Sequence, residues 1–245
     1  MTSRSFETLT IDDWHLRWFR HPRRRRAALR VEQGQISLHT PTRFPKQEAQ
    51  RFVRQQSQWL ERQQAAWQAL PDAPDWRPVA GAEWPYMGKN VSLVFDESSR
   101  TVRHFDEQLI LGCAGLSDDT GRFRRLKQWY RRQAESHLAQ QLELWSEHLG
   151  LQPNDCHIRR YKRRWGSCHA NGRISLNWCL IMAPQAVIDY VIIHELCHLQ
   201  YFNHSPDFWA LVQRYCPEWR QHRRWLADHG HCLDFPEQGP EPVTA

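Results

Sequence analysis

Short apolar runs alternate with polar turns through the first 118 residues, which predicts a β-rich region with one long helix. The helix is expected from Pro45 to about Leu70, and a loop rich in proline and glycine follows it. No segment of the chain repeats another at the level of sequence. The expected strands of this region cover residues 15–19, 26–31, 35–40, 89–95 and 101–111.

Helical spacing of apolar residues returns at Asp119 and continues to Leu149, where Gly150 stands at the position of a C-cap glycine. Two strands joined by a turn at Asn171-Gly172 are expected next, the second covering 173–182. Further helices are expected after Pro184, after Ser205-Pro206, and over 219–229.

These elements predict an α+β fold in two parts. An N-terminal β-rich region with one helix is expected over residues 1–118, and a second domain over 119–235. Residues 236–245 are polar and rich in proline, and we expect them to be a disordered tail.

Composition says more about the cellular compartment of the protein than about its function. The 245 residues carry a net charge of +6, which is compatible with an anionic partner without requiring one. No apolar run reaches the roughly 18 residues of a membrane span, and the first residues do not resemble a secretion signal. Seven scattered cysteines are then expected to be reduced thiols. We therefore expect a cytoplasmic protein without membrane contact.

The string His194-Glu195-Leu196-Cys197-His198 is an HExxH pattern on the expected helix after Pro184. Residues four apart on an α-helix lie about 40° apart around the axis and about 6 Å apart along it, so both imidazoles can bind one cation. Glu195 projects about 100° from His194, where it can hydrogen-bond a water on that cation without binding the metal. The spacing predicts two metal ligands and a general base.

His204 supplies a candidate third ligand. It follows His198 by six residues and precedes the helix start at Ser205-Pro206, so the intervening turn can bring it back to the metal. A purely structural role is the alternative, but a buried Glu195 would then need a partner, because an unpaired buried carboxylate costs several kcal/mol. A single zinc ion per chain, bound by His194, His198 and His204, compensates all of these polar groups together.

Other residues near the motif have less defined roles. Cys197 is expected to pack in the core, because it points away from His198. The sequence does not choose among several candidates for polarising a substrate oxygen or for orienting a ligand imidazole. The former are Tyr201, His222, His229 and His231, and the latter are Asp228 and Asp234.

The segment around these residues resembles the YgjP-like metallopeptidase family, bacterial zincins related to SprT-like proteins. The resemblance rests on the strings RRWGSC, LNW, HELCHL and NHSPDFW, and it extends over about residues 20–235. It implies zinc ligands at His194, His198 and His204, with Glu195 as catalytic base. It also implies a zincin-like domain in which the HExxH helix lies beside a small mixed sheet. An edge strand of such a sheet can pair with an extended peptide, and Ile174 to Leu180 is our candidate for that strand.

Three functions remain open at this stage. The leading hypothesis is a zinc-dependent metallohydrolase, most simply a cytoplasmic peptidase acting on peptides or proteins. The arginine clusters, including Arg23 to Arg26, also permit a metal-dependent nucleotide or phosphoanhydride hydrolase. The same arginines, 13 tryptophans and the SprT-like kinship leave a nucleic-acid-associated protein as the third hypothesis.

Overall fold

The computed structural model describes residues 6–32 and 34–239, and the chain divides into two compact units, Met1–Leu70 and Pro71–Ala245. The division differs from the boundary expected at residue 118. The reason is that the strands between residues 83 and 112 share one hydrophobic core with the helix that begins at Asp119. The two units have separate cores.

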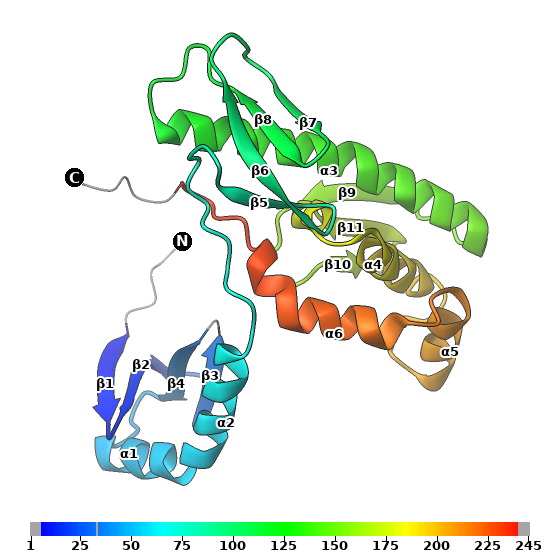
Figure 1. Cartoon of the computed structure of the whole chain (residues 1–245). Helices are drawn as coiled ribbons and strands as arrows, with labels where there is room; N and C mark the ends of the chain where they lie inside the picture. Colours follow the sequence, from blue (N-terminus) through cyan, green and yellow to red (C-terminus); the bar gives the residue numbers. More distant parts are fainter. Residues whose placement is uncertain (1–5, 33, 240–245) are drawn as a thin grey trace. The chain divides into compact units, whose positions relative to one another are not determined.

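The N-terminal unit is a four-stranded sheet followed by two helices (Figure 1). The strand order is β1-β2-β4-β3, with β2 and β4 parallel and the two outer pairs antiparallel. The single helix expected up to Leu70 is interrupted at Gln56, whose backbone (φ −105°, ψ 11°) departs from helical geometry. The elements are β1 (Glu7–Ile11), β2 (Trp14–His21), β3 (Ala28–Glu32), β4 (Gln35–Pro41), α1 (Lys46–Gln55) and α2 (Ser57–Gln68).

The C-terminal unit begins with a sheet of the same topology, a repetition that the sequence did not indicate. Its order is β5-β6-β8-β7, again with a parallel central pair and antiparallel outer pairs. In both sheets the last paired residues of every hairpin are three positions apart, which leaves two residues in the turn. Each of these turns contains a residue with positive φ. Such two-residue turns match the twist of paired strands. The strands are β5 (Glu83–Tyr86), β6 (Lys89–Asp96), β7 (Val102–Phe105) and β8 (Gln108–Gly112).

A long helix, α3 (Asp119–Leu149), lies along this second sheet and confirms the predicted helix over the same residues. Its N-cap residue is Asp118, whose side chain accepts a hydrogen bond from the Gly121 backbone N–H. Its C-cap residue is Gly150, which has the left-handed conformation (φ 68°) that favours glycine at a helix C-terminus.

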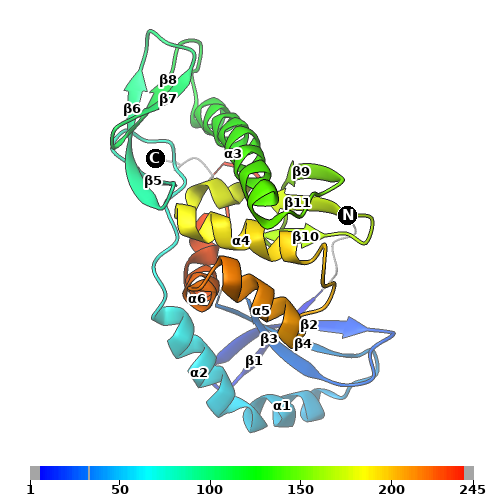
Figure 2. The same ribbon diagram turned by 90° about the vertical axis from the view of Figure 1, so that its right-hand side faces the viewer.

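The remaining elements form a small mixed sheet and three helices. The sheet order is β10-β11-β9, with β10 antiparallel and β9 parallel to β11. The hairpin predicted at Asn171-Gly172 joins β10 to β11, and Gly172 has a positive φ of 79°. Figure 2 shows α4 between α3 and α6, with the small sheet beside it. The elements are β9 (Asp155–Arg159), β10 (Gly166–Cys168), β11 (Arg173–Asn177), α4 (Gln185–Cys197), α5 (Pro206–Tyr215) and α6 (Trp219–His229).

The expectation of an edge strand over Ile174 to Leu180 was wrong in two respects. The strand ends at Asn177, and residues Trp178–Met182 form a 3-10 helix capped by the Asn177 side chain. In addition, β11 is the central strand of its sheet, because β10 and β9 pair with its two sides. The edge on the side of α4 is therefore β10.

Residues after α6 return to the core of the C-terminal unit. A second 3-10 helix, Gly230–Leu233, follows α6, and the Phe235 ring is fully buried among aromatic side chains that include Trp84 and Trp178. The Lys127 ammonium donates to the carbonyls of Pro236 and Glu237. The tail expected to be disordered from residue 236 is thus ordered as far as 239, and residues 240–245 lie outside the described residues.

The N-terminal sheet contains a histidine that should make its stability depend on pH. The His39 ring stacks on Phe19 and His21 and hydrogen-bonds His21, with 2.9 Å between the two nitrogens. Burial, followed by nearby positive charges, lowers the pKa of His39 to about 4. Between this value and the usual histidine pKa of about 6.5, the unfolded chain binds the extra proton.

We expect the free energy of unfolding to decrease as the pH falls from about 6.5 to about 4, since protonation of His39 then favours the unfolded chain. Urea unfolding followed by tryptophan fluorescence at a series of pH values measures this dependence. His39→Gln should weaken it, whereas the same change at the exposed His15 should leave it intact. Equal pH dependence in wild type and His39→Gln would contradict the assignment.

Candidate metal centre and active site

Helix α4 provides an apolar and firmly positioned base for the site. Most of its side chains are buried, which is unusual for a helix that also carries histidine and glutamate. Its start is held by the turn between β5 and β6, because the backbone N–H groups of Met87 and Gly88 donate to carbonyls of Ile181 and Met182. Gly88 approaches so closely that a Cβ there would lie 2.7 Å from the Pro184 Cα.

Three imidazoles converge at the other end of α4. His194 lies in its last turn, His198 is its C-cap residue, and His204 precedes α5. The Nε2 atoms of His194 and His204 are 3.2 Å apart, and potential ligand atoms of all three residues lie within 4.8 Å of one another. Two nitrogens bound to one tetrahedral zinc ion would be about 3.3 Å apart, so the observed separation fits a shared cation.

The turn after α4 gives His198 and His204 their orientations. His198 Nδ1 donates to the Tyr201 carbonyl at 2.9 Å, so its Nε2 lone pair is left for a metal. Ser205 caps α5 by accepting a hydrogen bond from the Phe208 N–H, and this fixes the residue just before it, His204.

Aromatic side chains of α5 pack against the three imidazoles. The centroid of the fully buried Phe208 ring lies 4.4 Å from that of the His198 ring. Its distances to the centroids of the His204 and His194 rings are 4.9 and 5.0 Å, respectively. Trp209 stacks on His204 at 5.4 Å. These contacts restrict the ring orientations, which preorganises the cluster.

The electrostatic environment favours neutral imidazoles. Burial first, and then the neighbouring imidazoles and Arg223, lower the pKa of His194 to about 3. Burial also lowers the pKa of His198. Neutral imidazole is the form that binds metal ions, so a lowered pKa reduces the competition of protons with a metal for these nitrogens. His194 Nδ1 is buried without a hydrogen-bond partner among the described residues.

Glu195 lies with its carboxylate against strand β10. It is only 6% exposed, and burial raises its pKa to about 8, opposed by a hydrogen bond from the Cys168 backbone and by the charge of Arg164. A Cβ at Gly166 would lie 2.5 Å from the Glu195 Oε1, so only glycine fits there without displacement. A cation held by the adjacent imidazoles would favour the charged carboxylate.

The structure places the other sequence candidates away from the three imidazoles or in different roles. Cys197 is fully buried, in agreement with packing. Tyr201 contributes its carbonyl to His198, while its hydroxyl accepts a hydrogen bond from Gln200. His222 lies beside the site, with its ring 6.3 Å from Tyr190, which is itself 5.9 Å from His194.

The remaining candidates belong to other contacts. His229 stacks on Trp225 and lines a cavity near Pro184, at the opposite end of α4 from the imidazoles. His231 bonds to the Pro71 carbonyl. Asp228 and Asp234, the candidates for orienting a ligand imidazole, pair with Arg224 and Arg160, respectively.

Sequence reasoning missed Gly166, Tyr190 and Arg223 as neighbours of the site. An isolated glycine in a short strand indicates close approach of another group, and this signal was available for Gly166. Tyr190 lies four residues before His194 on the same helix. No sequence signal links Arg223 to the imidazoles, because α6 reaches them only through tertiary packing.

Comparison with known proteins identifies the family. A family model described as the YgjP-like metallopeptidase domain matches residues 25–229. The chain belongs to the YgjP-like metallopeptidase family. A member of this family is a metal-dependent hydrolase, and the resemblance stated from the sequence is confirmed.

Comparisons with individual proteins add little to the assignment that the family model provides. A solved structure, the metallopeptidase zymogen of Pyrococcus abyssi abylysin, is 27% identical to the aligned part. The alignment covers 37% of this chain and 92% of that chain, with a TM-score of 0.34. A comparison with curated proteins gave no match. Within the described residues, no helix has both the length and the apolar character needed to cross a membrane.

Removal of one imidazole should weaken metal binding. We expect purified wild type to bind one zinc ion per chain and His204→Ala to bind it at least about 100-fold more weakly, since even residues that only orient a ligand contribute about 10–100-fold. Competition with a chromogenic chelator measures the affinity. His157→Ala, at an exposed histidine of β9, is the matched control. Unchanged zinc affinity in His204→Ala would exclude the proposed ligand set.

Substitution at Gly166 should disturb Glu195 and spare the imidazoles. The backbone of Gly166 is outside the left-handed region, so the effect of Gly166→Ala is steric. We expect a loss of about 1–3 kcal/mol in the free energy of unfolding, measured in urea, with zinc stoichiometry retained. Cys168→Ala keeps the backbone N–H that Glu195 accepts and should stay close to wild type. A fully stable Gly166→Ala protein would show that the contact is not tight.

Proposed function

We propose that the chain is a zinc-dependent peptidase with a zincin-like active site, in which His194, His198 and His204 hold one zinc ion and Glu195 is the general base. The observation that carries this proposal is the convergence of three imidazoles beside a buried carboxylate, which lies on the same helix as His194. Three protein ligands leave one position of a tetrahedral ion open, which is typical of catalytic zinc sites.

Zinc bound there would supply a Lewis acid that acidifies a water and polarises the scissile carbonyl. Glu195 then accepts a proton from the attacking water and transfers it to the nitrogen of the leaving amine as the peptide bond breaks. Its buried position suits both steps, because a desolvated carboxylate is a stronger base than an exposed one. The Cys168 N–H holds the carboxylate while the proton moves.

Strand β10 is the surface that we propose for the substrate backbone. It is an edge strand, and its Gly166 contacts Glu195, so an extended peptide paired with β10 would pass close to the base. Backbone hydrogen bonds to an edge strand bind peptides with little dependence on their sequence. This replaces the earlier candidate at Ile174 to Leu180.

A reducing compartment agrees with the state of the cysteines, and we propose that the enzyme is cytoplasmic. All seven cysteines are free thiols in the structure. Disulfides are rare where thiols are kept reduced, and common in small secreted proteins.

Peptide substrates are favoured over the two other hypotheses by membership of a peptidase family. The arginines at 23–26, which suggested phosphate binding, follow β2 in the N-terminal unit. Family membership gives no comparable support to a nucleotide or phosphoanhydride hydrolase or to a nucleic-acid-associated protein.

Cleavage should depend on Glu195 and on zinc. We expect zinc-loaded wild type to hydrolyse an unfolded protein or a mixed peptide pool, and Glu195→Gln to lower kcat by about 10²–10⁴-fold, because an amide cannot accept the proton. Zinc content should not fall in this variant, and Glu143→Gln on the exposed face of α3 is the control. Chelation should abolish cleavage and added zinc should restore it. Equal rates in Glu195→Gln and wild type would refute the assigned base.

A further inference from the structure

The segment that contains β10 carries an uninterrupted positive charge. Between Cys156 and Ile188 there is no aspartate or glutamate. The segment includes six basic residues, Arg159, Arg160, Lys162, Arg163, Arg164 and Arg173. So high a density of one charge along the strand next to a candidate active site affects which peptides can bind there.

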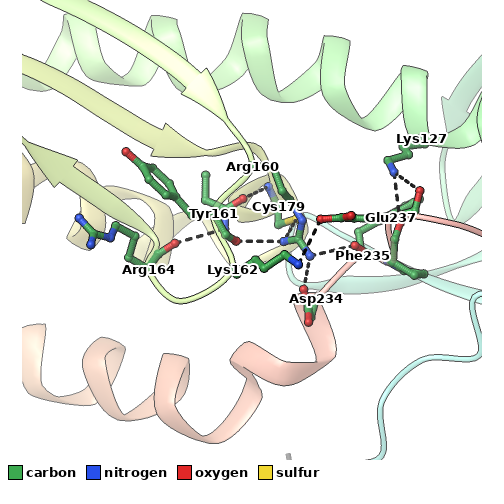
Figure 3. Close-up of polar contacts among 11 residues, drawn as sticks. Lys127, Arg160, Tyr161, Lys162, Arg164, Cys179, Asp234, Phe235 and Glu237 are labelled. Carbon is green, nitrogen blue, oxygen red and sulfur yellow. Dashed lines mark hydrogen bonds and ion pairs between the residues drawn. The ribbon is translucent and has the colours of Figure 1, made fainter. Parts of the chain in front are cut away.

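Two of these charges are neutralised within the protein. Arg160 pairs with Asp234 and also donates to the Phe235 carbonyl at 2.9 Å, and the Lys162 ammonium lies 3.6 Å from a Glu237 oxygen. Figure 3 shows both side chains reaching toward the C-terminal segment, whereas the Arg164 guanidinium points away from it. Arg160 and Lys162 therefore have a structural role, whereas Arg164 is directed elsewhere.

Of the other four, Arg159 and Arg164 are the two tied to β10. Both guanidinium groups approach the Tyr161 ring, at 4.7 and 5.6 Å from its centroid. Arg159 donates to the Tyr161 hydroxyl, which in turn is 2.7 Å from the Ser167 Oγ on β10. Both arginines are exposed, and neither forms an ion pair with a carboxylate in the described part of the chain.

Arg164 also lies close to the reacting groups. It is two residues before Gly166, the residue that contacts the Glu195 side chain. Its positive charge acts on the Glu195 carboxyl, although the two do not form an ion pair. A side chain of a peptide bound along the start of β10 could therefore approach this guanidinium from one face of the strand.

Arg223 supplies a positive charge on the α6 side of the imidazoles. Its guanidinium is 5.8 Å from the Trp209 ring, and Trp209 stacks on His204. Its charge acts on both His194 and Tyr190. It is exposed and forms no ion pair with a carboxylate among the residues that the structure describes.

We propose that the substrates are acidic peptides, with aspartate or glutamate side chains next to the scissile bond that are bound by Arg164, supported by Arg159, and by Arg223. This inference rests on the proposed peptidase function and defines its substrate class. A guanidinium pairs with a carboxylate through two parallel hydrogen bonds, and a bound peptide would shield such pairs from water. Basic peptides would meet repulsion from both sides of the imidazole cluster.

The test compares matched peptides with glutamate, glutamine or lysine at each position flanking one scissile bond in turn. We expect kcat/KM of zinc-loaded wild type to be at least about tenfold higher for glutamate than for glutamine at one or more positions, and lower still for lysine. The preference should decrease as salt is added. Arg164→Gln and Arg223→Gln should each lower the glutamate-to-glutamine ratio, while Arg132→Gln on α3 should not.

A charge-reversed variant distinguishes a change in substrate preference from a loss of activity caused by misfolding. Arg164→Glu should shift the preference at its position from glutamate toward lysine, a change that general damage to the protein cannot produce. Cleavage of the glutamine peptides with no preference for glutamate would overturn the substrate class and leave the peptidase function intact. No cleavage of any peptide would instead refute the peptidase function. Stronger inhibition of cleavage by a single-stranded oligonucleotide than by polyglutamate would assign the arginines to phosphates and overturn the proposal.

Discussion

The active-site region of the C-terminal unit depends on one constraint: the polar side chains of the otherwise apolar helix α4 must find partners on other elements. Helix α4 buries Glu195 and the Nδ1 atom of His194 among residues that offer them few hydrogen bonds. The carboxylate is accommodated by the bare backbone of Gly166 and the Cys168 N–H. His194 and His204 hydrogen-bond each other, His198 bonds to the Tyr201 carbonyl, and all three imidazoles pack against Phe208 of α5. Each compensation comes from a different element, so the site exists only when β10, α4 and α5 are assembled together.

Positioning of α4 links distant parts of the C-terminal unit to this site. The β5–β6 turn bonds to the residues just before the helix, α3 and α6 cover its sides, and Phe235 closes the core beside the 3-10 helix that precedes it. Because close-packed interiors transmit strain, a change at Gly88 or Phe235 acts on the start of α4. The residues outside the site that matter most to it are those that keep this helix in place.

Local patterns in the sequence were sufficient for much of the fold and for the grouping of the three histidines. Helix α3, the Asn171-Gly172 hairpin and the Ser205 cap each follow from signals within a few residues, and so does the pairing of His194 with His198. Tertiary relations had no such signal. The central place of β11, the approach of Arg223 and the union of residues 83–112 with α3 depend on pairings between distant segments, which neither spacing nor composition encodes.

The two four-stranded sheets share one topology and carry different tasks. In the N-terminal unit the pattern makes a core of its own with α1 and α2, and in the C-terminal unit it shares one core with α3 and α4. Chains with like modules risk exchanging strands between them while they fold. In these two sheets every hairpin closes across a two-residue turn. Contacts between neighbouring residues form faster than contacts between distant ones, so each strand is expected to pair with its hairpin partner before a strand of the other sheet can reach it. The short turns thus disfavour the exchange of strands between the two similar sheets during folding.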